Sequence, residues 1–202
     1  MNIGKNRFEA VVIGSSAGGI KALSMVLAAL PGDFALPVII VQHLHPSSDS
    51  YLARILDAKC QLTVKQADEK EAIAEGVVYI APPNYHLLIE EDRSLSLSVE
   101  GPVNFARPSV DVLFESAVYA YRNKLIGMIL TGANNDGHQG VKKIKQIGGY
   151  VIVQDPATAE ADAMPKAAIA ATQVDKILPL EQIGPYLLQL VNRSVNNLRF
   201  SI

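Results

Sequence analysis

Short, continuous apolar runs alternate with helical patterns along most of the chain. The runs lie at Phe8–Gly14, Leu36–Gln42, Lys124–Thr131 and Tyr150–Gln154. Segments with apolar residues at helical spacing follow the first three runs, near residues 20–30, 51–59 and 141–147. Continuous apolar strands are typical of a parallel sheet that helices cover on both faces. The pattern therefore predicts an α/β fold with a doubly wound, mostly parallel sheet flanked by helices.

Turn residues divide the middle of the chain into shorter pieces. Strand-like segments lie at Gln61–Lys65, Val77–Ala81, Tyr85–Glu90 and Ser94–Val99. Their turn-separated pattern predicts a small antiparallel hairpin or meander insert near residues 60–100. A helical stripe follows over residues 110–121, with Pro108 and Ser109 as start signals, and residues 180–191 predict a closing helix. We expect one domain over residues 1–202.

Composition limits the class of protein. The chain has 202 residues, 49% hydrophobic and 19% charged, with a formal net charge of −2. This composition is typical of soluble globular proteins, and the small charge gives no electrostatic reason to expect a nucleic-acid partner. No apolar run approaches the ~18 residues that cross a bilayer, so we expect no membrane insertion and a cytoplasmic location. The single cysteine, Cys60, excludes an intramolecular disulfide and a multi-cysteine metal site.

The clearest local signal is the glycine-rich segment between the first apolar run and the first helical pattern. Gly14-Ser15-Ser16-Ala17-Gly18-Gly19 contains the Gly-x-Ser-x-Gly spacing of a nucleophile elbow. In an elbow the serine lies on a tight strand-to-helix turn, where the helix N-terminus stabilises developing negative charge. The segment also fits a phosphate-binding turn, or a turn whose serine caps the helix. A dinucleotide-binding fingerprint fits less well, because Ser16 replaces the second glycine.

Two more polar residues follow predicted parallel strands. His43 closes the second apolar run, and Asp136 lies in the loop after the third. Because the carboxyl ends of parallel strands meet at one edge of the sheet, Ser16, His43 and Asp136 are expected to face one crevice. There His43 would act as a base and Asp136 would orient it. Taken alone, His43 also fits a loop residue and Asp136 a cap of the next helix, and His45 and His86 are weaker candidates for the base.

The order of these residues disfavours one familiar class. It is Ser, His, Asp here, whereas α/β-hydrolases place the acid second and the histidine last. The four histidines and one cysteine show no HExxH or CxxC spacing, and the sequence has no GxxxxGK[ST] nucleotide loop. We therefore predict no metal site and no cofactor.

Several motifs, taken together and in order, resemble one known family. They are VVIGSSAGG (11–19), VQHL (41–44), VYIAPP (78–83), RPSVD (107–111), LTGANNDG (130–137), QDP (154–156) and AMP (163–165). This series is similar to the catalytic domain of bacterial chemotaxis protein-glutamate methylesterases, the CheB family. The likeness runs from about Val11 to about Ala171, so it covers most of the chain.

The resemblance implies a serine hydrolase on a doubly wound parallel sheet. Matched motif to motif, Ser16 is the nucleophile, His43 the general base and Asp136 its orienting acid. Backbone N–H groups near Ala17 and Ala133 are the candidates for the oxyanion hole. The family hydrolyses methyl esters of glutamate side chains on the cytoplasmic helices of chemoreceptors, and some members also deamidate glutamines. The expected partner is thus a methyl-accepting chemoreceptor or a similar protein substrate.

Two features depart from the family pattern. Full-length members usually carry an N-terminal phospho-receiver domain, for which the ten residues before Val11 leave no room. We therefore expect a fragment, a stand-alone member or a form regulated by a separate protein. The loop that commonly has Gly-Met-Gly reads Gly132-Ala133-Asn134 here, which removes a methionine from the mouth of the site. Two other functions stay open: a carboxylesterase or amidase on another substrate, and a non-catalytic phosphate-binding module.

Overall fold

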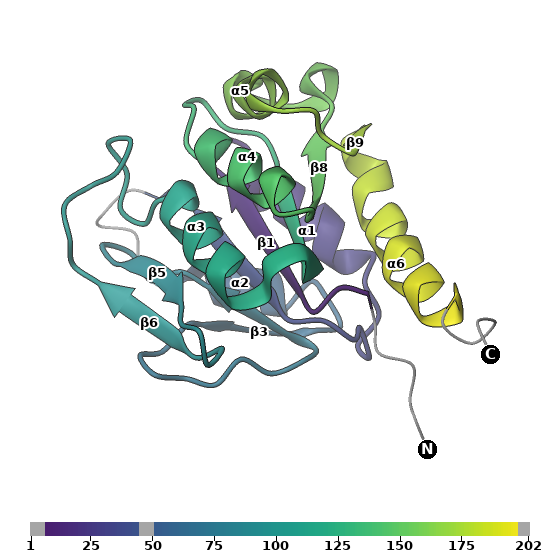
Figure 1. Ribbon diagram of the computed structural model, residues 1–202, viewed down its shortest axis with the longest axis horizontal. Helices are drawn as coiled ribbons and strands as arrows, with labels where there is room; N and C mark the ends of the chain where they lie inside the picture. Colours follow the sequence, from purple (N-terminus) through teal and green to yellow (C-terminus); the bar gives the residue numbers. More distant parts are fainter. Residues whose placement is uncertain (1–6, 45–50, 198–202) are drawn as a thin grey trace.

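The computed structural model describes residues 7–44 and 51–197 and shows a three-layer α/β fold (Figure 1). The strands of its main sheet are β1 (Ala10–Ser15), β2 (Val38–Gln42), β3 (Thr63–Gln66), β4 (Val77–Ile80), β7 (Leu125–Ile129), β8 (Tyr150–Gln154) and β9 (Lys176–Leu178). They run in the order β3-β4-β2-β1-β7-β8-β9, and every neighbouring pair is parallel. The predicted parallel sheet is confirmed.

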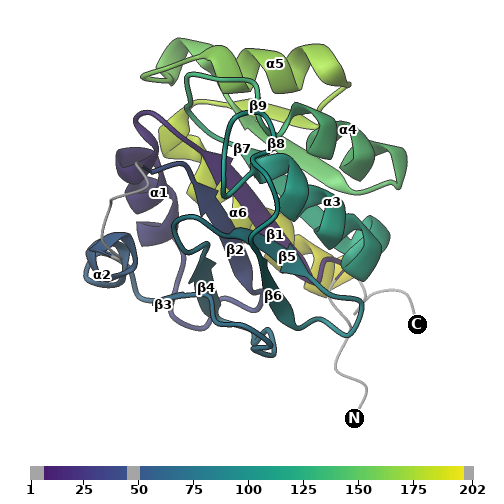
Figure 2. The same cartoon turned by 90° about the vertical axis from the view of Figure 1, so that its left-hand side faces the viewer.

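Helices cover both faces of this sheet (Figure 2). They are α1 (Gly19–Ala28), α2 (Tyr51–Asp57), α3 (Val110–Tyr121), α4 (His138–Gln146), α5 (Ala163–Ala171) and α6 (Leu180–Asn197), with short 3-10 helices at Arg122–Lys124 and Pro156–Thr158. The α1, α2 and α6 helices share one hydrophobic core with the sheet, and α3, α4 and α5 share the other. Successive β1 residues alternate between the cores, Val11 in the first and Val12 in the second, which explains why the strand is apolar throughout.

The predicted antiparallel insert near residues 60–100 is smaller than expected. Only β5 (His86–Ile89) and β6 (Leu95–Ser98) form an antiparallel hairpin. It packs on α3, where the Ser116 hydroxyl accepts a hydrogen bond from the Ile89 N–H at 3.0 Å. The β3 and β4 strands instead belong to the parallel sheet, because β4 is buried on both faces, with Val78 in one core and Tyr79 in the other.

The C-terminal part contains two elements that the sequence pattern did not predict. The α5 helix is rich in alanine, so its buried face gives a weak hydrophobic signal, and β9 has only three residues. The predicted closing helix is α6, which packs on the sheet through Ile183, Leu187 and Val191. Within the described ranges, no helix combines the length and the apolar character that crossing a membrane requires.

Candidate active site

Three neighbouring strands, β2, β1 and β7, carry the loops that hold the predicted site residues. Because the strands are parallel, these loops leave the same edge of the sheet. Backbone hydrogen bonds join them: the Ser16 N–H donates to the Thr131 carbonyl at 2.9 Å, and the His43 N–H donates to the Ser15 carbonyl at 3.0 Å. The structure thus brings Ser16, His43 and the Asp136 loop together, as the strand pattern predicted.

Ser16 lies on a turn whose close contacts depend on glycine. The α1 helix has Gly18 as its N-cap, in a left-handed conformation with a φ of 76° that other residues rarely adopt. The alternative in which Ser16 caps α1 is therefore wrong. On the other side of the serine, a Cβ at Gly132 would overlap the Met164 side chain and lie 3.0 Å from the Ser16 Cβ. A glycine at position 132 lets the loop after β7 approach the serine closely.

A buried glutamine fixes the ends of β1 and β2. The Gln42 carboxamide oxygen accepts a hydrogen bond from the Ser15 hydroxyl at 2.7 Å, and its nitrogen donates to the carbonyls of Ser16 and His43, both at 2.8 Å. Gln42 is 4% exposed, so its polar atoms are satisfied by the protein itself. Sequence reasoning missed this role, for which the one available signal was an uncharged polar residue closing an apolar strand.

The Asp136 carboxylate is the most densely hydrogen-bonded group of the site. Its side chain is fully buried, and Oδ2 lies 2.9 Å from His43 Nε2. The other donors to its two oxygens are Asn104 Nδ2 at 3.0 Å, Ser109 Oγ at 2.9 Å and the backbone N–H groups of Val110 at 2.7 Å, Asp111 at 3.1 Å and Gly137 at 3.0 Å. Burial opposes ionisation, but the hydrogen bonds from His43, Asn104 and the backbone outweigh it and lower the pKa of Asp136. The group is a carboxylate at neutral pH.

This carboxylate lies at the N-terminus of α3 rather than α4. The N–H groups of Val110 and Asp111 open α3, where intrahelical acceptors are lacking and a negative charge is stabilised. The α4 helix has Gly137 as its N-cap and no side-chain cap. The alternative in which Asp136 serves as a cap of the following helix is therefore wrong. The interaction with α3 joins segments distant in sequence, so the sequence pattern gave no sign of it.

The hydrogen bonds also define the state of the His43 ring. Every group that contacts the Asp136 carboxylate must donate to it, so His43 Nε2 carries a hydrogen. The other ring nitrogen, Nδ1, lies 3.1 Å from the side-chain nitrogen of Asn134. The neutral ring therefore has its lone pair on Nδ1, and Nδ1 is the nitrogen available to act as a base.

A second buried carboxylate, Asp111, lies beside Asp136, and sequence reasoning did not single it out. Burial raises the pKa of Asp111, with a smaller contribution from the nearby Asp136 charge, although the Gly140 N–H donates to it at 2.7 Å. Asn104 connects the two acids, since its Nδ2 lies 2.8 Å from Asp111 Oδ2 and 3.0 Å from Asp136 Oδ1. The pair has opposite pKa shifts because Asp136 receives more hydrogen bonds.

Two other described histidines, His86 and His138, form their hydrogen bonds with groups other than Ser16. His86 is 2% exposed, with one ring nitrogen receiving the Ser109 N–H at 3.2 Å and the other 3.1 Å from the Gly101 carbonyl, so it has a structural role. His138 contacts the Asn135 carbonyl at 2.6 Å. His45 lies outside the described residues. The described part of the chain contains no group of histidine, cysteine or acidic side chains able to hold a metal ion.

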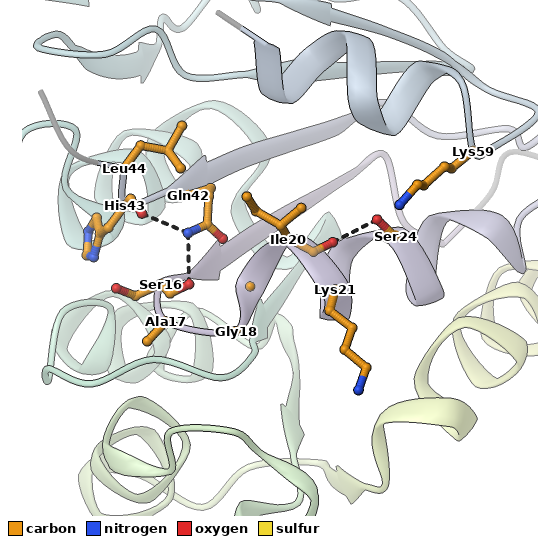
Figure 3. Close-up of a pocket in the computed structure, with 11 residues that line it drawn as sticks. Ser16, Ala17, Gly18, Ile20, Lys21, Ser24, Gln42, His43, Leu44 and Lys59 are labelled. Carbon is orange, nitrogen blue, oxygen red and sulfur yellow. Dashed lines mark hydrogen bonds between the residues drawn. The ribbon is translucent and has the colours of Figure 1, made fainter. Parts of the chain in front are cut away.

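An open cleft of about 750 Å³ extends from Ser16 along α1 (Figure 3). His43 and Ser16 line one end of it, and Lys59 and Ser24 line the other. Lys21 and Lys59 are exposed, and neither forms an ion pair with another described residue. These two lysines thus contribute positive charge to the cleft beside the serine.

The two backbone groups predicted for the oxyanion hole have hydrogen-bonding capacity that the described residues do not use. The N–H groups of Ala17 and Ala133 have no hydrogen-bond acceptor among the residues that the structure describes. Ala17 follows the serine, and Ala133 follows Gly132, whose position next to Ser16 is described above. The Ser16 hydroxyl likewise has no partner in residues 7–44 and 51–197. Free donors beside a free hydroxyl are what an attacking serine and its oxyanion require.

Comparison with known proteins agrees with this architecture. The family model of the CheB methylesterase matches residues 11–187. A Leptospira interrogans protein is 55% identical over 91% of this chain and 95% of its own length. The protein-glutamate methylesterase/protein-glutamine glutaminase 2 of Caulobacter vibrioides is 40% identical over 89% of this chain, which spans only 53% of that protein.

A solved structure has the same fold. The crystal structure of the Thermotoga maritima CheB methylesterase catalytic domain superposes with a TM-score of 0.87 and 38% identity, covering 91% of this chain and 99% of that one. The family, fold and enzyme class expected from the motifs are confirmed. The chain belongs to the CheB methylesterase family.

Proposed function

We propose that this chain is a serine hydrolase that demethylates glutamate methyl esters, with Ser16 as nucleophile, His43 as general base and Asp136 as orienting acid. The observation that carries the proposal is the 2.9 Å hydrogen bond between His43 Nε2 and the buried Asp136 carboxylate, in a cleft that both His43 and Ser16 line. Membership of the CheB methylesterase family supports the choice of substrate.

The reaction begins with attack of Ser16 Oγ on the ester carbonyl of the substrate side chain. The O–H proton passes to Nδ1 of His43, while Asp136 holds Nε2–H and stabilises the positive charge on the ring. The carbonyl oxygen becomes an oxyanion that the N–H groups of Ala17 and Ala133 are placed to receive. Collapse of the tetrahedral intermediate breaks the C–OCH₃ bond, and His43 returns the proton to the leaving methanol.

Water completes the reaction by the same steps in reverse. His43 takes a proton from the water as it attacks the acyl-serine, and then returns it to Ser16 Oγ, leaving a glutamate carboxylate. A glutamine side chain would follow the same route with ammonia as leaving group, so we include deamidation in the proposal. The open cleft with Lys21 and Lys59 favours a protein segment with acidic side chains. We propose a methyl-accepting chemoreceptor helix as the substrate, and the cytoplasm as the location of the reaction.

The phosphate-binding alternative has less support in the geometry. A phosphate cradle needs several loop N–H groups that point outward. Here the Ser16 N–H donates to the Thr131 carbonyl, and the Gly19 N–H donates to the Ser16 carbonyl at 2.8 Å, so two of these donors are used within the protein. A carboxylesterase or amidase with another substrate would use the same catalytic residues, and only substrate profiling distinguishes it.

Methanol release from a methylated chemoreceptor cytoplasmic fragment tests the proposal. The Ser16→Ala variant should lose about 10³-fold or more of kcat. It should fold with an unchanged melting temperature, since the hydroxyl has no partner among the described residues. Ser98→Ala, on the β5–β6 hairpin, is the matched control and should release methanol at the parent rate. Equal turnover by Ser16→Ala and the parent protein would refute the proposal.

A further inference from the structure

Asn134 makes two hydrogen bonds inside the candidate site. It lies in the loop between β7 and α4. Its side-chain oxygen accepts the Asp136 N–H at 3.1 Å, and its side-chain nitrogen lies 3.1 Å from His43 Nδ1. The side chain is half-buried, so these contacts are partly shielded from water.

The chemistry of the neighbours fixes which atom of the amide faces which group. A backbone N–H only donates, so the atom that faces the Asp136 N–H is the Asn134 oxygen, and the amide nitrogen must face the imidazole. His43 Nε2 is already the donor to the Asp136 carboxylate. His43 Nδ1 therefore presents its lone pair to Asn134, which donates to it.

The hydrogen bond from Asn134 occupies His43 Nδ1, the atom that must accept the Ser16 proton in the proposed reaction. A neutral imidazole has one lone pair in the ring plane, and Ser16 must donate its hydroxyl hydrogen to that lone pair before the proton moves. Once Nδ1 is protonated, it faces the N–H of Asn134 as a second donor, which is repulsive. Asn134 thus favours the resting state over both the productive Ser16–His43 contact and the charged ring.

We propose that Asn134 restrains the reaction by blocking the base nitrogen of His43 in the resting site, so that the Asn134–Nδ1 hydrogen bond must break before Ser16 is activated. The inference rests on the proposed function. Its proton balance is simple: the Ser16 O–H bond breaks, the Nδ1–H bond forms, and the Asn134 N–H is left without an acceptor until the proton leaves. Asn134 is a positioning residue, because it acts on the reaction through His43.

The test compares the rate of covalent labelling of Ser16 by an aryl phosphonate ester, and kcat for methanol release, in two neighbouring variants. Asn134→Ala removes the blocking donor. Asn135→Ala is the matched control, because Asn135 is exposed and its side chain makes no hydrogen bond with a described residue. We expect labelling and kcat to rise about three- to tenfold in Asn134→Ala, with KM unchanged, since a neutral hydrogen bond shifts an equilibrium by roughly that factor. Asn135→Ala should match the parent.

A second variant repeats the test with a different residue at this position. Asn134→Gly also removes the donor to Nδ1 and adds no charge beside the imidazole, so it should also label faster than the parent. A labelling rate at or below that of the parent in both Asn134 variants would overturn the inference.

Nitrogen NMR of the imidazole distinguishes failure of the inference from failure of the proposed function. With ¹⁵N-labelled histidine, the Nδ1 resonance of His43 should move in Asn134→Ala and stay fixed in Asn135→Ala, whether or not Ser16 is a nucleophile. An unmoved resonance would refute the contact itself. Absence of phosphonate labelling in every variant, with the resonance shift present, would instead refute the proposed function.

Discussion

The two sides of the candidate site are built in opposite ways. Around Asp136, Oδ1 accepts four hydrogen bonds and Oδ2 two, and the side chain is fully buried at the N-terminus of α3. Around Ser16, the hydroxyl and the N–H groups of Ala17 and Ala133 have no partner among the described residues, and the open cleft begins there. One side is organised before any substrate arrives, whereas the other has its hydrogen-bonding capacity left for a ligand.

This difference predicts which substitutions reduce both stability and activity and which reduce activity alone. Removing a group on the Asp136 side leaves buried donors without acceptors, which costs folding free energy as well as activity. Removing the Ser16 hydroxyl leaves no group of the described residues without its hydrogen-bond partner, so we expect that change to affect the reaction alone. Gln42 is expected to affect both stability and the reaction, because its side-chain nitrogen donates to the carbonyls of Ser16 and His43.

The largest combined loss of activity and stability is expected for Asp136→Asn. The amide cannot accept hydrogen bonds at both positions, and it no longer stabilises the charged His43 ring, so kcat should fall about 10³- to 10⁴-fold. The free energy of unfolding at neutral pH should fall by roughly 2–4 kcal/mol. Urea unfolding and methanol release measure the two losses.

The stability loss of Asp136→Asn has a definite pH dependence. Because the folded-state pKa of Asp136 is lowered, its contribution is present above the unfolded pKa of about 4 and is lost as the pH falls through the folded value. The gap between parent and variant should therefore narrow on acidification. Asp33→Asn, at an exposed carboxyl, serves as the control and should match the parent in stability at neutral pH. A gap that widened in acid would contradict the account of Asp136.

Gln42→Glu should have an intermediate effect. The carboxylate still accepts the Ser15 hydroxyl but faces the Ser16 and His43 carbonyls with no donor. We expect about 10- to 100-fold lower kcat and roughly 1–3 kcal/mol lower stability. Gln182→Glu, exposed on α6, is the matched control. Parent-like kcat in Gln42→Glu would show that this glutamine does not position the site.

The smallest effect is expected for the two lysines that line the cleft, Lys21 and Lys59. Replacing Lys21 and Lys59 together by alanine should raise KM for the chemoreceptor fragment about three- to tenfold at low salt and leave kcat and stability unchanged. Lys142→Ala, exposed on α4, serves as the control. Turnover of a small, uncharged glutamate methyl ester should be the same in all three proteins. An equal rise in KM for the small ester would count against a role in binding acidic protein segments.

Much of the fold was predictable because the central strands are buried on both faces. Runs such as the one that becomes β1 have few alternatives to a parallel sheet once helices separate them. The assignment of β3 and β4 to an antiparallel insert was wrong, because four-residue strands give too little pattern to reveal burial on both sides. The α5 helix was missed because alanine marks no clear face.

The sequence pattern predicted which loops meet at the site, but it did not predict the hydrogen bonds between them. Strand order placed Ser16, His43 and the Asp136 loop at one edge, but nothing local indicates that Asp136 receives the first N–H groups of α3. Which nitrogen of the His43 ring faces Asp136, and what Asn104 and Asn134 contact, depends on side chains from segments distant in sequence. The catalytic roles of the three residues stay a prediction that experiments must test.

Trapping the covalent intermediate tests the central claim most directly. The protein would be quenched in acid during turnover of a glutamate methyl ester peptide, and its peptides mapped by mass spectrometry. The account predicts an acyl group on Ser16 in the parent protein and none in His43→Ala. An acyl group on another residue, or methanol release with no covalent intermediate under these conditions, would contradict it.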